Sequence, residues 1–316
     1  MDSVYVGVDL GGTKIASVAT DSEGRILYRD SRPTNASSGE EKVIDSIKDA
    51  IRSLADHLSI DTSELAGIGV GCPGPLSMET GIVYSTPNLK WTNVPLRDIM
   101  EREFGVKVIL DNDANVAGLA EWRFGAGERC RNMVYVTVST GVGGGLVIDG
   151  DVYRGSTSFA GEIGHITVVE NGPICGCGKR GCLESLASGT AMANRAKEMA
   201  KTLTGKRILE EALGDVEKID AKAISAAAGK GDPFANEIID EAIRYLSIGL
   251  ASIVTLLSPD RLVIGGGVTN IGDRFMVPLE RMVRDRALVE SAEHVVIRKA
   301  SLGADVGSLG AVSLLL

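Results

Sequence analysis

Two similar segments constrain the fold of this 316-residue chain more than any other feature of its sequence. Residues 4–12 read VYVGVDLGG and residues 134–142 read VYVTVSTGV. Both are predicted to be strands rich in β-branched residues, and each ends in a bend rich in Gly, Ser and Thr. Each bend continues into a second apolar stretch whose tip, DSEG or IDGD, has the composition of a turn. The repeat predicts two halves that each open with a β-hairpin, and the alternative is convergence between two ordinary hairpins.

Helical and strand-like patterns alternate in the rest of the chain. Apolar residues at helical spacing predict a helix over 41–58, and strand-like stretches follow at 65–74 and 106–113. The region 189–257 has helical character, and a further strand is expected at 260–268. Alternation of this kind indicates an α/β architecture with mostly parallel strand connections.

Two hairpin-led halves imply two lobes, although no low-complexity linker separates them. We place the boundary near Ala117, within a stretch at 112–125 that should be a helix. The expected small lobe covers residues 1–116 and is completed by a C-terminal helix at 303–316. The expected large lobe covers residues 117–302.

Charge and hydropathy argue against several classes of protein. The net charge of −9 disfavours a surface for nucleic acid or anionic membrane. The N-terminal run lacks the basic region and long apolar core of a signal peptide, and the best membrane candidate, 248–257, is about half the length needed to span a bilayer. We therefore expect a cytoplasmic protein with no nucleic-acid or membrane partner, in which structural disulfides are disfavoured.

Clustered glycines point to backbone that must approach a ligand closely. Two G-x-G-x-x-G matches, at Gly69/Gly71/Gly74 and Gly176/Gly178/Gly181, do not open helices, so the dinucleotide-binding interpretation is rejected. A P-loop is excluded as well, because Thr13 stands where its lysine belongs. Two hairpin bends remain, DLGGTK at 9–14 and STGVGGG at 139–145, together with VIGGGV at 263–268.

These bends could hold a nucleotide. Backbone N–H groups without bulky side chains can cradle phosphate oxygens, a strand-ending aspartate can hold hydrated Mg²⁺, and bare backbone can lie against an adenosine. Tight turns with no ligand are the alternative. The candidate residues are Asp9, Gly11, Gly12, Thr13, Lys14, Ser139, Thr140, Gly141, Gly143, Gly265, Gly266 and Gly267.

Taken together, the segments resemble the ROK family of sugar kinases over essentially the whole chain. DLGGTK and STGVGGG are similar to the family's two phosphate loops and GGGV to its adenosine segment, while GCPGPL and LDNDANVAGLAE look like its sugar-site segments. GEIGH followed by CGCGKRGCLE is similar to its zinc and sugar signature, in the form most like the glucokinases. The resemblance implies the actin/hexokinase-like ATPase fold, an α/β fold of duplicated ribonuclease H-like domains.

The resemblance also implies an activity, the phosphorylation of a hexose by ATP with Mg²⁺. We expect the substrate to be glucose and the product to be glucose 6-phosphate. We also expect the protein to form a homo-oligomer, either a dimer or a tetramer. Alternatives within the family are an N-acetylmannosamine, N-acetylglucosamine or fructose kinase. A sugar-responsive transcriptional regulator without its DNA-binding domain is a further alternative.

Site residues follow from the same resemblance. Asp113 would be the general base, although Asn112 and Asp113 alone would be interpreted as a helix N-cap. The implied sugar-binding residues are Gly74, Asn112, Asp113, Glu162, His165 and Glu184.

Cysteine spacing suggests a metal site in the segment CGCGKRGCLE. Cys175, Cys177 and Cys182 offer three thiolates within reach of one ion, and His165 is the candidate fourth ligand. Three sulfurs and one nitrogen suit Zn²⁺, and four protein ligands indicate a structural site with no open position. A redox role is disfavoured, because no C-x-x-C motif is present.

Overall fold

The computed structural model describes residues 3–86 and 88–316. The chain forms two compact units. The first comprises Met1–Arg131, Gly145–Gly161 and Ser301–Leu316, and the second comprises Asn132–Gly144 and Glu162–Ala300. The division into a small lobe at 1–116 with 303–316 and a large lobe at 117–302 remains a prediction.

A five-stranded sheet with the order β3-β2-β1-β4-β8 organises the first unit. β1 pairs antiparallel with β2, which pairs antiparallel with β3, whereas β1, β4 and β8 are parallel. Every residue of β4 is buried, as expected for a central parallel strand that is covered on both faces. The strands are β1 (Tyr5–Leu10), β2 (Lys14–Thr20), β3 (Ile26–Pro33), β4 (Gly67–Cys72) and β8 (Val108–Asn112).

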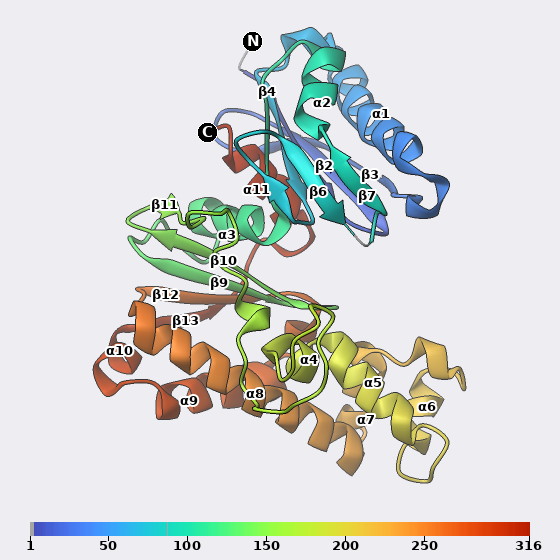
Figure 1. Ribbon diagram of the computed structural model, residues 1–316, viewed down its shortest axis with the longest axis vertical. Coiled ribbons are helices and arrows are strands. Elements are labelled where there is room, and N and C mark those ends of the chain that lie inside the picture. Colours follow the sequence, from blue (N-terminus) through green and yellow to red (C-terminus); the bar gives the residue numbers. More distant parts are fainter. Residues whose placement is uncertain (1–2, 87) are drawn as a thin grey trace. The chain divides into compact units, whose positions relative to one another are not determined.

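Helices and a small antiparallel sheet complete the first unit. α1 buries the apolar stripe that predicted it, including Val43, Ile47, Ile51 and Leu54, and it packs on β2 and β3 (Figure 1). The other helices are α2 (Leu96–Phe104), α3 (Asp113–Phe124) and α11 (Val306–Ser313), and α1 spans Glu40–Leu58. The small sheet has the order β5-β6-β7, with β5 (Leu76–Ser77), β6 (Ile82–Thr86) and β7 (Trp91–Val94).

Glycines in β1 and β4 let the C-terminal helix α11 lie directly on the sheet. A Cβ at Gly7 would lie 2.0 Å from the carbonyl oxygen of Ser308, and one at Gly69 would lie 1.8 Å from that of Ala311. Such distances are far below any van der Waals contact. Only glycine therefore allows this helix to pack here.

The second five-stranded sheet has the order β11-β10-β9-β12-β13. β12 is parallel to both β9 and β13, and β10 pairs antiparallel with β11. In both sheets the first strand is central, the hairpin extends to one side, and two parallel strands lie on the other. The predicted α/β class and the repeat are confirmed. The strands are β9 (Met133–Val138), β10 (Val142–Ile148), β11 (Asp151–Val152), β12 (Arg261–Gly265) and β13 (Val296–Lys299).

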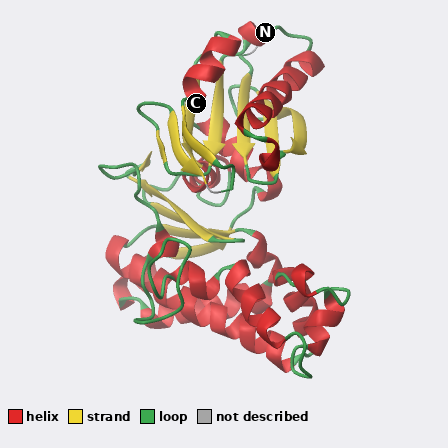
Figure 2. Ribbon diagram, turned by 45° about the vertical axis from the view of Figure 1, so that its right-hand side comes forward, coloured by secondary structure: helices red, strands yellow, loops and turns green. Residues whose placement is uncertain are grey.

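Helices make up most of the second unit outside its strands (Figure 2). The longest, α8, starts at an Asp232 N-cap whose side chain accepts from the Ala235 N–H at 2.8 Å, and Pro233 is its first residue. Among the described residues, no helix is both long and apolar enough to cross a bilayer. The helices are α4 (Leu183–Ala187), α5 (Gly189–Met199), α6 (Lys206–Glu211), α7 (Ala221–Gly229), α8 (Pro233–Leu257), α9 (Asp273–Arg286) and α10 (Val289–His294).

Candidate active site

The bend between β1 and β2 is closed by backbone and crowded by neighbours. The Gly11 N–H donates to the Lys14 carbonyl at 3.0 Å, and the Thr34 N–H donates to the Thr13 carbonyl at 3.0 Å. A Cβ at Gly12 would lie 3.1 Å from the Cβ of Asn88, so a larger residue would press on that side chain. The bend therefore presents nearly bare backbone, as the sequence predicts.

Asp9, the last but one residue of β1, lies under the start of α11. A Cβ at Gly307 would lie 2.4 Å from its Cγ. Burial raises the pKa of Asp9 to about 6, and the charge of Lys14 partly opposes this shift. A carboxylate in such surroundings gains stability from a cation.

The junction of β8 and α3 holds the proposed base. The side-chain oxygen of Asn112 accepts from the N–H groups of Ala114 at 2.9 Å and Asn115 at 3.4 Å, which makes Asn112 the N-cap. Asp113 is the first residue of the helix, and its Oδ1 accepts from the Ala114 N–H at 2.8 Å. A Cβ at Gly74 would lie 3.3 Å from the Asn112 Nδ2. Gly74 and Asn112, which were predicted from separate segments, thus lie close together.

A buried ion pair that the sequence did not reveal supports this junction. Asp111 is 3% exposed, and its Oδ1 accepts from the Asn112 N–H at 2.7 Å and from the Asn115 Nδ2 at 3.0 Å. Its Oδ2 accepts from Arg154 Nε at 2.8 Å and lies 2.7 Å from Arg154 Nη2. The Asp111 carboxylate is therefore saturated with donors, and it fixes the backbone directly before Asp113.

The second bend, Ser139–Val142, is held by the first two residues of α5. The Gly189 N–H donates to the Ser139 carbonyl at 2.7 Å, and the Thr190 N–H donates to the Thr140 carbonyl at 3.3 Å. Within the bend, the Ser139 N–H donates to the Gly141 carbonyl at 2.8 Å.

A cavity of about 440 Å³ adjoins this bend within the second unit. Its size and its mixture of hydroxyl, lysine and apolar side chains suit a nucleoside with attached phosphates. Of the candidate residues of this unit, Ser139, Thr140 and Gly267 line it. Gly141, Gly143, Gly265 and Gly266 are not among its lining residues in the described part of the chain. The sequence missed the contributions of α5 and α7, and the full lining is Ser139, Thr140, Gly189, Thr190, Ala193, Asn194, Lys197, Ile219, Asp220, Ala221, Lys222, Gly267 and Val268.

Close packing explains the glycines that end β12. Gly266 has a φ of 88°, and a Cβ there would lie 2.3 Å from the Val138 carbonyl oxygen. A Cβ at Gly265 would lie 2.7 Å from the Tyr135 hydroxyl. These two glycines therefore shape the backbone that leads to Gly267.

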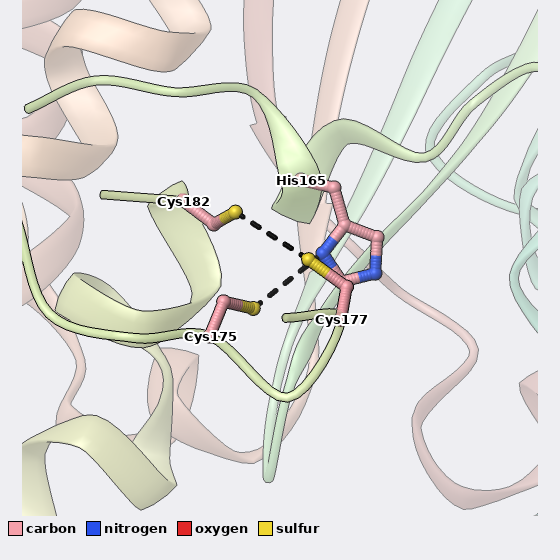
Figure 3. Close-up of side chains that lie close together, drawn as sticks. All are labelled: His165, Cys175, Cys177 and Cys182. Atoms are coloured by element: carbon pink, nitrogen blue, oxygen red, sulfur yellow. Dashed lines mark hydrogen bonds between the residues drawn. The ribbon is translucent and has the colours of Figure 1, made fainter. Parts of the chain in front are cut away.

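The predicted Cys–His cluster is assembled in the second unit (Figure 3). The ligand atoms of His165, Cys175, Cys177 and Cys182 all lie within 4.8 Å of one another. The Cys175 Sγ lies 3.7 Å from the His165 Nδ1, and the Cys177 and Cys182 Sγ atoms are 3.7 Å apart. Zn–S bonds of about 2.3 Å and Zn–N bonds of about 2.0 Å around a tetrahedral ion give edges of roughly 3.5–3.8 Å. The cluster therefore fits Zn²⁺.

The thiols of the cluster would have to lose their protons to bind a metal ion. Burial raises the pKa of Cys175, and it raises the pKa of Cys182 to about 12. A hydrogen bond from the Lys179 backbone lowers the pKa of the exposed Cys177. A bound divalent ion would stabilise the buried thiolates, and the three cysteines are free of disulfides.

Both predicted sugar carboxylates lie beside this cluster. His165 directs Nδ1 toward the sulfurs (Figure 3), and its Nε2 lies 3.8 Å from a carboxylate oxygen of the half-exposed Glu162. The Glu184 Oε1 lies 3.8 Å from the Cys175 Sγ, and its Oε2 accepts from the Val142 N–H at 3.0 Å. The contact between Glu184 and the second bend was not anticipated from the sequence.

Comparison with known proteins shows which family has this architecture. The model of the ROK family matches residues 5–316, and the chain belongs to that family. The glucokinase of Halalkalibacterium halodurans is 40% identical over 314 residues, which cover 98% of this chain and 94% of that protein. The glucokinase of Thermotoga maritima is 37% identical, with 98% of this chain and 96% of that protein covered.

A solved structure extends the comparison to three dimensions. A ROK family glucokinase from Streptomyces griseus, in complex with glucose and AMPPNP, is 36% identical with a TM-score of 0.85, and 99% of both chains is covered. The predicted family and the predicted actin/hexokinase-like fold are thereby confirmed.

Proposed function

We propose that this protein is an ATP-dependent glucokinase that transfers the γ-phosphoryl group of ATP to the 6-hydroxyl of glucose. The observation that carries this proposal is the match to a glucose- and AMPPNP-bound relative over 99% of both chains. Little of either chain lies outside the shared fold, and two assembled features support the proposal: the Asn112–Asp113 junction and the Cys–His cluster.

The nucleotide is proposed to bind at the glycine-rich bends. Adenosine would occupy the cavity beside Ser139–Val142 and Gly267, whose lysines and hydroxyls complement the phosphates. Asp9 would hold hydrated Mg²⁺, and the backbone and side chains of Gly11–Lys14 would contact phosphate oxygens. Mg²⁺, when bound, neutralises charge that develops on the transferred group.

Asp113 is proposed as the general base. Its carboxylate takes the proton of the sugar hydroxyl while that oxygen attacks the γ-phosphorus, and the bond to the bridging oxygen breaks so that ADP leaves with the electron pair. A side chain at the first position of a helix, preceded by the fixed Asp111 and Asn112, is held rigidly for this role.

Glucose is proposed to bind through groups that suit a neutral polyol. Gly74 gives close access to the ring, Asn112 offers an amide, and Glu162, His165 and Glu184 offer carboxylate and imidazole groups. With Nδ1 ligating the metal, the His165 Nε2 is left to donate to a sugar hydroxyl. The zinc itself is proposed to be structural, with His165, Cys175, Cys177 and Cys182 as its ligands.

A coupled assay with a panel of acceptors tests the proposal. Glucose, mannose, fructose, N-acetylglucosamine and N-acetylmannosamine would be compared, each with ATP and with polyphosphate as donor. We expect the highest kcat/KM for glucose with ATP. A preference for fructose or an N-acetylhexosamine would change the assigned substrate, and the absence of any kinase activity would overturn the proposed function. Sedimentation would test the expected dimer or tetramer.

A further inference from the structure

Glu184 contacts both the metal cluster and the second bend. Its Oε2 accepts from the Val142 N–H at 3.0 Å, and its Oε1 lies 3.8 Å from the Sγ of Cys175, a candidate zinc ligand. The side chain leaves the first turn of α4, two residues after Cys182. One carboxylate therefore spans the distance between the cluster and the bend.

The bend is shaped to receive this carboxylate. A Cβ at Gly141 would lie 2.4 Å from the Glu184 Oε2, so only glycine leaves room for it. A carboxylate that accepts from a backbone N–H forms a charge-assisted hydrogen bond, stronger than a neutral one. Glu184 thus adds a side-chain tie to the backbone bonds that Gly189 and Thr190 donate to Ser139 and Thr140.

The position of Glu184 depends on the cluster. α4 has five residues, and a helix of one turn has little stability of its own. Its N-cap is Cys182, which is fully buried, and the Leu183 N–H donates to the Ile166 carbonyl at 2.9 Å, next to His165. Two ligands of the proposed ion therefore flank the turn that carries Glu184.

The segment of His165 also abuts the bend. A Cβ at Gly164 would lie 2.1 Å from the Val142 carbonyl oxygen, so these two backbones are in direct contact. Val142 is consequently held through its N–H by Glu184 and packed through its carbonyl side by Gly164.

We propose that Glu184 is a positioning residue that transmits the state of the metal cluster to the phosphate-binding bend, so that loss of the metal weakens nucleotide binding even without sugar. This inference rests on the proposed function only in assigning nucleotide phosphates to the bend.

Nucleotide affinity in the absence of sugar is the decisive measurement. Titration calorimetry with Mg·AMPPNP would compare wild type and Glu184→Ala, each with zinc and after chelation, with elemental analysis to fix the zinc content. We expect metal removal or Glu184→Ala to raise the Kd by roughly tenfold, the cost of about one charge-assisted bond. Removing zinc from Glu184→Ala should add little further, because both changes break the same link.

Two variants separate the link from charge and from misfolding. Glu184→Gln keeps an oxygen that can accept from Val142 and should bind the nucleotide within about threefold of wild type. Glu170→Gln removes an exposed carboxylate from the same loop region and should change nothing. An unchanged nucleotide Kd in zinc-free wild type would overturn the inference. So would a Kd in zinc-free Glu184→Ala that is raised by the product of the two separate fold-changes.

Hydrogen exchange at the Val142 amide gives a readout that does not depend on nucleotide. Exchange should speed up in zinc-free wild type and in Glu184→Ala, and stay slow in Glu184→Gln. If the zinc-loaded protein bound no nucleotide, the proposed function would fail, and this exchange would still decide the link. Equal protection of the Val142 amide with and without zinc would contradict it.

Discussion

At the residue scale, the strand end Asp111–Asp113 concentrates three different tasks in three consecutive side chains. Asp111 is buried and saturated by donors, Asn112 caps α3, and Asp113 starts that helix. The first two tasks are structural, and they hold the third residue in a fixed place. The arrangement explains how one short segment could serve both folding and the catalysis that we propose for Asp113.

Replacing Asp113 by Asn tests the base. The amide keeps the shape of the side chain but cannot accept the hydroxyl proton, so kcat should fall by roughly 10²–10⁴-fold. The Kd for glucose should change little, since the hydrogen-bonding pattern is largely kept. Steady-state kinetics and a glucose titration on the same sample make the comparison, and a near wild-type kcat would remove Asp113 from the mechanism.

Replacing Arg154 by Gln tests the Asp111–Arg154 ion pair next to the proposed base. Asp111 would be left buried with an uncompensated charge, and the free energy of unfolding should drop by about 2–4 kcal/mol. Urea unfolding measures this change. The double variant Arg154→Gln with Asp111→Asn removes the stranded charge and should recover part of the loss; no recovery would mean that Arg154 acts by another route.

Asp9 predicts a pH dependence of stability. Its pKa is about 6 in the folded protein against an ordinary value of 3.8, so the folded state favours the protonated form. Ionisation of Asp9 should therefore lower the free energy of unfolding of the wild type as pH rises from about 4 through about 6, by at most about 3 kcal/mol. Asp9→Asn cannot ionise, so its stability relative to wild type should increase across that window and level off above it.

Urea unfolding at several pH values, without Mg²⁺ or nucleotide, measures this difference. A stability difference between Asp9→Asn and wild type that stayed constant from pH 4 to pH 7 would show that the Asp9 carboxyl has an ordinary pKa in the folded protein.

At the scale of elements, the glycines of β1 and β4 decide whether α11 can pack. Gly69→Ala would place a Cβ 1.8 Å from the Ala311 carbonyl oxygen, so the helix must shift, and we expect a loss of at least about 3 kcal/mol. Gly229→Ala is the matched control: it lies in α7 with no atom near its Cβ position, and alanine there should stabilise by about 0.5–1 kcal/mol. Equal effects of the two substitutions on thermal unfolding would contradict this account of the packing.

Elements also explain what the sequence could and could not predict. The bends, the Asn112–Asp113 pair and the cysteines are short contiguous patterns whose residue types carry their chemistry, so they could be read directly. Arg154 and Asp111 lie far apart in sequence, as do Glu184 and Val142, and only the folding of the sheets and α4 brings each pair together. The cavity residues of α5 and α7 have no motif at all, because ordinary helix positions line it.

At the scale of the whole molecule, the two sheets repeat one strand order, each with a hairpin bend next to a central strand. A duplicated scaffold of this kind supplies two glycine-rich bends from a single architecture, and the match to the ROK family runs through nearly all of it. The proposed function then depends on what is added to the scaffold, namely the Asp111–Asp113 segment in the first unit and the Cys–His cluster and cavity in the second.

Phosphorus NMR of a single reaction identifies the phosphate compounds that the protein makes from ATP and glucose. Purified protein would be incubated with ATP, Mg²⁺ and glucose, and the products followed over time. We expect glucose 6-phosphate and ADP in equal amounts, and far slower ATP hydrolysis when glucose is omitted. Release of inorganic phosphate without a sugar phosphate, or a phosphate attached at another position of glucose, would contradict it.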